Sequence, residues 1–124
     1  LAAMMTPLSK NDETLLSKES VKRLSKSNMR SYIDNMLLFP TNFSEGFMLN
    51  MDNRGNFEGE GGSFLIGNNA FGHVGFGGSS ATFSDPDCNL SFGYLVNKLG
   101  GEYLINERGQ NLIDEAYKSL VNLS

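Results

Sequence analysis

The chain has 124 residues, of which 40% are hydrophobic and 19% charged, and its net charge is −4. These proportions fit one soluble globular domain, or a piece of a larger one, and exclude a disordered chain. The longest apolar run, residues 1–5, has five members, whereas a membrane-spanning helix needs about 20. The sequence therefore predicts no membrane span.

The rare residue types and the charge pattern narrow the possible sites. One cysteine, Cys88, and one histidine, His73, exclude an internal disulfide framework and a zinc site built from several such ligands. Residues 1–30 contain six Lys/Arg and three Asp/Glu. Because acids accompany these bases, the segment predicts a solvated helix face and not a nucleic-acid surface. We expect no metal, no cofactor and no nucleic-acid partner.

The first half of the chain predicts helices followed by irregular structure. Residues 1–5 have the pattern of a helix end that stops before Pro7, because the residue before a proline avoids the helical conformation. Ser17 can cap a second helix, which we expect to continue to about Lys26. The remaining segments are a connector over residues 31–43, a short strand over 47–51 and a loop over 57–69.

The second half of the chain gives clearer signals. Residues 79–84 and 90–97 are strand-like runs around a five-residue loop, which predicts a hairpin. Residues 107–123 predict a helix with one broad apolar face, which the nearby hairpin can cover. The order of helix, strands and helix predicts an α+β fold, in which an antiparallel sheet of about three to four strands is packed by the C-terminal helix.

Glycine is concentrated around the single histidine. Ten of the 14 glycines fall between Gly46 and Gly78, and four of them accompany His73 within residues 71–80. Glycines let the backbone bend sharply and let another molecule approach the peptide N–H groups. An exposed N–H beside an imidazole would suit an oxyanion site. A structural role for His73 in a glycine-rich strand entry is the alternative, and both interpretations stay open.

Other candidate sites have weaker support. Residues 77–81 approach the nucleophile-elbow pattern G-x-S-x-G, but Ala81 replaces the last glycine and the run continues as a strand. Glu58 and Glu60 could form a paired-carboxylate site, although solvated loop charge explains them better. A structural interpretation is also preferred for three residues of the predicted turn: Asp85, Asp87 and Cys88.

Three segments together indicate a family. The run F-G-H-V-G-F-G-G-S at residues 71–79 is followed by F-S-D-P-D at 83–87 and L-S-F-G-Y-L-V-N at 90–97. They resemble the C-terminal part of the β-lactamase-related serine hydrolases, the group of class C β-lactamases, penicillin-binding proteins and esterases. Residues 1–24 and 107–121 are similar to helices of the same family. The resemblance implies the C-terminal part of a serine β-lactamase-like α+β fold.

The resemblance also implies a site. In this family, a serine in S-x-x-K, a tyrosine in Y-x-N and a K-T-G or H-x-G strand surround the substrate. Only the third motif is here, as His73, Val74 and Gly75. It implies that His73 faces the substrate, that Gly75 keeps the strand close to it, and that the Phe76 N–H is an oxyanion donor. Val74 replaces a hydroxyl that would bind a substrate carboxylate, which favours an esterase- or peptidase-like relative.

The other two motifs are missing from these 124 residues. No serine is followed three places later by lysine, and Tyr117, in a Y-x-S pattern, falls on the packed face of the predicted C-terminal helix. We therefore expect residues 1–124 to be the C-terminal portion of one β-lactamase-related domain, not catalytic alone. It would supply the H-x-G wall of an acyl-enzyme hydrolase that acts on a small ester or amide. A non-catalytic β-lactamase-like binding or scaffold protein is the alternative.

Overall fold

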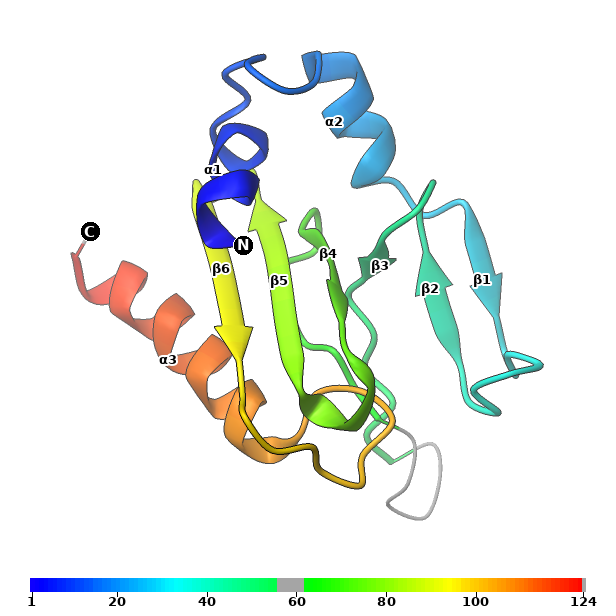
Figure 1. Ribbon diagram of the computed structural model, residues 1–124. Coiled ribbons are helices and arrows are strands. Elements are labelled where there is room, and N and C mark those ends of the chain that lie inside the picture. Colours follow the sequence, from blue (N-terminus) through cyan, green and yellow to red (C-terminus); the bar gives the residue numbers. More distant parts are fainter. Residues whose placement is uncertain (56–61, 124) are drawn as a thin grey trace.

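The computed structural model describes residues 1–55 and 62–123. Two helices come first along the chain, the strands follow, and a long helix comes last (Figure 1). The elements are α1 (Ala2–Lys10), α2 (Lys18–Leu24), β1 (Met29–Ser31), β2 (Thr41–Phe43), β3 (Met48–Leu49), β4 (Phe71–Val74), the 3-10 helix η1 (Phe76–Gly78), β5 (Ser80–Asp85), β6 (Leu90–Leu95) and α3 (Glu107–Leu123).

The strands form one antiparallel sheet in the order β1-β2-β3-β4-β5-β6. The predicted α+β architecture, an antiparallel sheet packed by a C-terminal helix, is confirmed. The expected number of strands is too low, because the described sheet has six. The predicted connector contains the last residue of β1 and all of β2, which have three residues each. Strands of this length are too short to show the alternation that identifies a strand in a sequence.

Helices pack on both faces of the sheet (Figure 1). Phe83 of β5 belongs to the larger hydrophobic cluster, together with Ile113 of α3. The next residue, Ser84, donates its hydroxyl to the Met5 carbonyl of α1 over 2.7 Å. Because successive strand residues point to opposite faces, α1 and α3 lie on opposite sides of β5. A smaller cluster on the α1 side consists of Met5, Leu8, Val21, Leu49 and Phe71.

The first two helices differ in part from the prediction. The expected helix stop before Pro7 is wrong, because α1 continues through Pro7 to Lys10. A proline here removes the donor to the Ala3 carbonyl, and Ala3 is exposed, so that water can reach it. The second helix is capped as predicted, since the Ser17 hydroxyl accepts from the Ser20 N–H over 3.2 Å.

The C-terminal half matches its prediction closely. The hairpin is formed by β5 and β6, whose ladder ends at the pair Asp85↔Leu90, so that the turn has residues 86–89. The last helix has the predicted bounds, but its apolar face is only partly covered, because Ile113 is 0% exposed and Leu112 47%. Within the described ranges, none of the helices has the length and apolar character needed to cross a membrane.

Candidate functional site

The H-x-G motif begins on β4, which contains His73 and Val74, and ends at Gly75, directly before η1. Phe71 packs in the α1-side cluster, whereas Val74 is buried in the cluster on the α3 side. Since side chains alternate along a strand, His73 shares the face of Phe71, and its side chain is exposed there. The strand therefore places the single histidine at the surface, on the face opposite to α3.

The His73 imidazole turns toward the backbone of its own strand. Its Nδ1 lies 2.8 Å from the Val74 carbonyl oxygen. Because a carbonyl oxygen only accepts, Nδ1 carries the proton of this hydrogen bond. In the neutral ring, Nε2 then has a free lone pair and can accept a hydrogen bond or a proton.

Beyond His73, one edge of β4 is open. The Gly75 N–H donates to the Ser80 carbonyl over 2.9 Å, toward β5. Gly75 is extended, with φ −87° and ψ 150°, so the Phe76 N–H points to the opposite edge. On that edge, β3 pairs with Phe71 and Gly72, and no other described strand continues the ladder. The edge thus offers backbone groups to another molecule.

Gly75 fits a space that has no room for a side chain. A Cβ atom at this position would lie 2.5 Å from Ser80 Oγ and 2.6 Å from Ser79 Oγ. These distances are well below van der Waals contact, so the two hydroxyls would have to move. Glycine therefore lets the strand and the following serines come together beside the open edge.

The remaining two residues of the predicted wall contribute in different ways. The Val74 side chain is 5% exposed and packs in the core, so only its backbone can take part in a site. Phe76 is 66% exposed, and its ring meets that of Tyr103 edge-on at 5.9 Å between centroids. His73, Val74, Gly75 and Phe76, here called the H-x-G wall, thus present one imidazole, backbone polar groups and one aromatic ring.

The predicted turn residues have structural contacts. Asp85 accepts from the Tyr117 hydroxyl over 2.7 Å and from the Asp87 N–H over 3.0 Å. Tyr117 is on the packed side of α3, as predicted. Burial, and next the Asp85 carboxylate, raise the pKa of the Cys88 thiol, which disfavours the reactive thiolate. Glu58 and Glu60 lie outside the residues that the structure describes. Among the described residues, no cluster of three or more His, Cys, Asp or Glu side chains could hold a metal ion.

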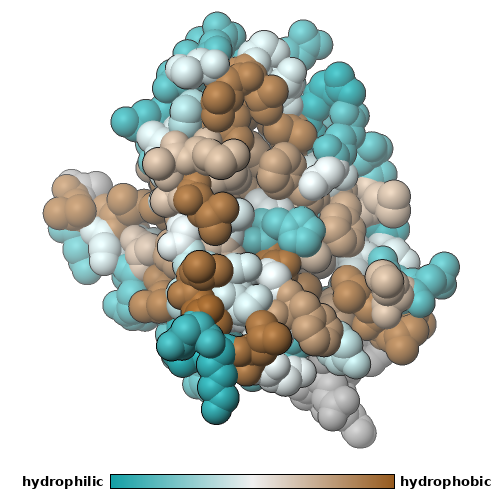
Figure 2. Space-filling view, in the orientation of Figure 1, coloured by the Kyte–Doolittle hydropathy of each residue, from teal (hydrophilic) through white to brown (hydrophobic). Residues whose placement is uncertain are grey.

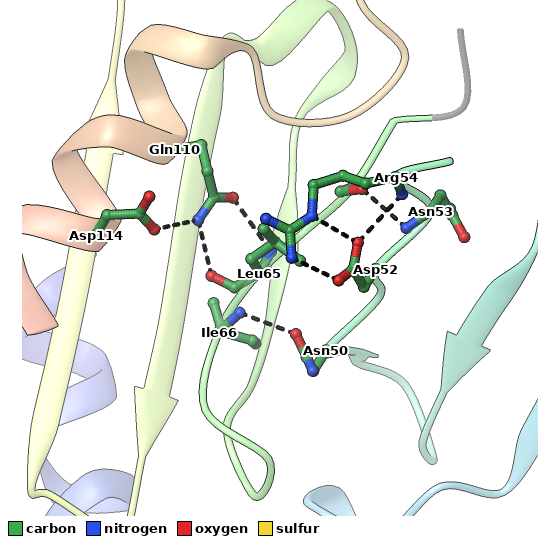
Figure 3. A network of polar contacts seen from close by, with 9 residues as sticks. Asn50, Asp52, Asn53, Arg54, Leu65, Ile66, Gln110 and Asp114 are labelled. Atoms are coloured by element: carbon green, nitrogen blue, oxygen red, sulfur yellow. Dashed lines mark hydrogen bonds and ion pairs between the residues drawn. The ribbon is translucent and has the colours of Figure 1, made fainter. Parts of the chain in front are cut away.

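A cavity of about 610 Å³ lies apart from the H-x-G wall, between the β1–β2 strands and residues 50–53. None of the four wall residues lines it. Its amide side chains are engaged in holding the backbone: Asn50 accepts from the Ile66 N–H over 3.1 Å (Figure 3), and Asn53 donates to the Gly62 carbonyl over 2.8 Å. The cavity was not predicted, because nothing in the sequence links its strands to residues 50–53. Its lining residues are Arg30, Ser31, Tyr32, Ile33, Pro40, Thr41, Asn42, Asn50, Met51, Asp52 and Asn53.

The sequence matches no protein-family model and none of the curated proteins, but the fold is similar to solved structures. A penicillin-binding protein homolog from Caulobacter crescentus has a TM-score of 0.75 and 29% identity, over 95% of this chain and 30% of that chain. A family VIII carboxylesterase has a TM-score of 0.75 and 25% identity, over 94% of this chain and 30% of that chain. EstA from Arthrobacter nitroguajacolicus Rue61a has a TM-score of 0.68 and 22% identity, over 89% of this chain and 26% of that chain.

These likenesses confirm the resemblance to the β-lactamase-related serine hydrolases. The chain has an α+β architecture that matches part of the β-lactamase-like fold. Its neighbours are of the penicillin-binding-protein-like and esterase-like kinds. The chain spans about 30% of the length of the first two structures.

Proposed function

We propose that residues 1–124 are the C-terminal portion of one β-lactamase-related domain and supply one wall of the active site of an acyl-enzyme serine hydrolase. The observation that carries the proposal is the open edge of β4, with the exposed His73 imidazole beside it. The similarity to a penicillin-binding protein homolog and a carboxylesterase supports the proposal at the level of the family.

The wall has the groups that acyl transfer requires on one side of the substrate. Attack on an ester or amide carbonyl places negative charge on its oxygen, and the Phe76 N–H can donate to that oxygen. Removal of one such donor slows known enzymes by a factor on the order of 100 to 1000. His73 Nε2 can accept a proton or a hydrogen bond near the reacting carbonyl. The H-x-G wall would therefore bind and orient the substrate carbonyl and stabilise the charge on its oxygen, while the nucleophile comes from outside residues 1–124.

Two observations support the proposal that further chain completes the domain. The sequence contains no S-x-x-K motif, so a serine nucleophile of this family would lie outside residues 1–124. In addition, Leu95 of β6 is 75% exposed and Leu112 of α3 is 47% exposed. Large apolar side chains on neighbouring elements are typical of surfaces that another part of a protein covers.

Covalent labelling tests the proposal. The full-length protein that contains residues 1–124 is incubated with a fluorescent fluorophosphonate, which reacts with activated serines. We expect labelling of the folded full-length protein and none of residues 1–124 alone or of heat-denatured protein. Absence of labelling in the folded full-length protein would overturn the hydrolase proposal. That result would favour a non-catalytic β-lactamase-like binding or scaffold protein.

A further inference from the structure

The turn that carries the proposed oxyanion donor depends on support from outside itself. Gly77 and Gly78, which follow Phe76 in η1, have φ values of +70° and +60°, a conformation that glycine adopts without strain. Glycine also has the most backbone freedom to lose on folding. One hydrogen bond, from the Gly75 N–H to the Ser80 carbonyl, closes the turn at its base. The direction of the Phe76 N–H is therefore set in part by contacts with other segments.

The loop after β6 supports the backbone of this turn. The Gly100 N–H donates to the Gly77 carbonyl over 2.7 Å. The Val96 N–H donates to the Ser79 carbonyl over 2.9 Å and continues the pairing of β5 with β6. A Cβ at Gly77 would lie 2.9 Å from the Gly100 carbonyl oxygen, so the two backbones are in close contact. These bonds hold the residues after Phe76, whereas Phe76 itself is held through its side chain.

The Phe76 ring packs against Tyr103 of the same loop. The two rings meet edge-on, with centroids 5.9 Å apart and planes at 80°, which is a preferred geometry for aromatic pairs. Of the ring contacts within residues 1–55 and 62–123, this one alone involves Phe76. Figure 2 shows apolar surface over η1, beside the polar side chains of the loop after β6. Tyr103 thus holds the Phe76 ring from the side of this loop.

Tyr103 is in turn fixed to the hydrophobic core. Its ring lies against that of Phe39, with centroids 6.3 Å apart and planes at 60°. Phe39 is 4% exposed, and Leu104, the neighbour of Tyr103 in the sequence, is 1% exposed; both belong to the larger core cluster. The contacts from Phe39 through Tyr103 to Phe76 therefore connect the turn to the core.

We infer that Tyr103 is a positioning residue of the proposed active site, because its ring fixes Phe76 and thereby the direction of the Phe76 N–H. This inference rests on the proposed function and adds a residue to it. A donor stabilises an oxyanion only if it already points to the place where the charge develops. A displacement on the order of 1 Å can cost about 100-fold in rate. The role requires contact of Tyr103 with Phe76 and Phe39, and none with the substrate.

The kinetics of fluorophosphonate labelling of the full-length protein test this role. The labelled fraction at long times counts the folded sites, whereas the first-order rate constant and the half-saturating probe concentration describe each site. In Tyr103→Ala, we expect the rate constant per site to fall by a factor of about 10 to 100. The half-saturating concentration should stay within about twofold, because the donor acts on charge that develops in the transition state. Tyr103→Phe, which keeps the ring, should retain the wild-type rate constant.

A purely structural role of Tyr103 gives a different result. It would lower the labelled fraction and the melting temperature of Tyr103→Ala but leave the rate constant per labelled site unchanged, and this result would overturn the inference. The matched control is Tyr32→Ala, which removes a 94% exposed tyrosine between β1 and β2. Its labelled fraction and its rate constant should both equal those of the wild type.

Backbone NMR relaxation of the Phe76 amide separates this inference from the hydrolase proposal. With 15N-labelled phenylalanine in the full-length protein, the Phe76 order parameter should be about 0.85 in the wild type and in Tyr103→Phe, and below about 0.6 in Tyr103→Ala. If the fluorophosphonate does not label the wild type, the proposed function fails, and this measurement decides whether Tyr103 fixes Phe76. A fall in the order parameter would then support the inference, and an unchanged order parameter in Tyr103→Ala would overturn it whatever the labelling result.

Discussion

The Tyr117 hydroxyl lies 2.7 Å from the Asp85 carboxylate and joins the C-terminal helix to the end of β5. The same hydroxyl accepts from the Gly67 N–H over 2.9 Å, so one atom connects three segments. Burial raises the pKa of Tyr117 far above its ordinary value, which keeps the hydroxyl protonated as the donor to Asp85. The ring also stacks on Phe83, with centroids 5.9 Å apart and planes at 11°.

This relationship predicts a loss of stability when the hydroxyl is removed. Tyr117→Phe keeps the stacked ring but leaves the buried Asp85 carboxylate and the Gly67 N–H without this partner. We expect the free energy of unfolding to fall by about 1–3 kcal/mol, measured by urea denaturation of the full-length protein. Tyr32→Phe, at a position that is 94% exposed, should change it by less than about 0.5 kcal/mol. Equal effects of the two substitutions would contradict the structural role of Tyr117.

The sequence predicts best where a regular element is long enough to show its period. The helix over residues 107–123 and the 79–84/90–97 hairpin have such patterns, and both are present with nearly the predicted bounds. The three-residue strands β1 and β2 do not, and they are stabilised by pairing with each other, as in Arg30↔Asn42. That pairing depends on contacts between segments, which local patterns do not show.

The candidate site could be predicted only in part, because some of its contacts join segments that are far apart in the sequence. The glycines around His73 signal close backbone approach, and the structure has it at Gly75, beside Ser79 and Ser80. The sequence did not reveal that Tyr103 meets Phe76, because the two residues are 27 positions apart and are brought together by η1 and the loop after β6.

Close packing between β4 and β5 gives a second prediction. A Cβ atom at Gly72 would lie 2.1 Å from the Thr82 carbonyl oxygen and 2.6 Å from Phe83 Cα. Because these atoms belong to the backbone of the paired strand, Gly72→Ala should force β4 away from β5 and reduce stability by about 2 kcal/mol or more. Gly101→Ala is the matched control, since its Cβ would have no atom within 4 Å. Similar melting temperatures for the two variants would be incompatible with this packing.

The Asp52–Arg54 ion pair gives a prediction for pH dependence. Hydrogen bonds from the Arg54 side chain and then from its backbone N–H lower the pKa of Asp52 from 3.8 to about 2; two of these contacts are 2.6 Å and 2.8 Å long (Figure 3). A lowered carboxyl pKa stabilises the folded state above pH 3.8, and this contribution disappears as the pH falls through about 2.

Titration of the Asp52 carboxyl carbon by NMR checks this prediction. In the wild type, we expect a midpoint near 2. In Arg54→Gln, the midpoint should rise but stay below 3.8, because the backbone N–H of residue 54 still donates to the carboxylate. The pair is exposed on the surface, so the substitution should affect stability only slightly. A midpoint that does not move in Arg54→Gln would show that the guanidinium does not cause the shift.

The last prediction separates a catalytic from a structural role of His73. The side chain is exposed, so His73→Ala should change the free energy of unfolding by less than about 0.5 kcal/mol. If the imidazole assists acyl transfer, the rate of fluorophosphonate labelling of the full-length protein should fall by a factor of roughly 100 or more. His73→Lys, which keeps a hydrogen-bond donor at this position, should recover part of the labelling rate.

The matched control is Thr82→Val, because Thr82 is the cross-strand neighbour of His73 on β5. The labelling rate of Thr82→Val should stay within about twofold of the wild-type rate. A labelling rate unaffected by His73→Ala would remove His73 from the site, whereas a parallel loss of stability and labelling would assign it a structural role.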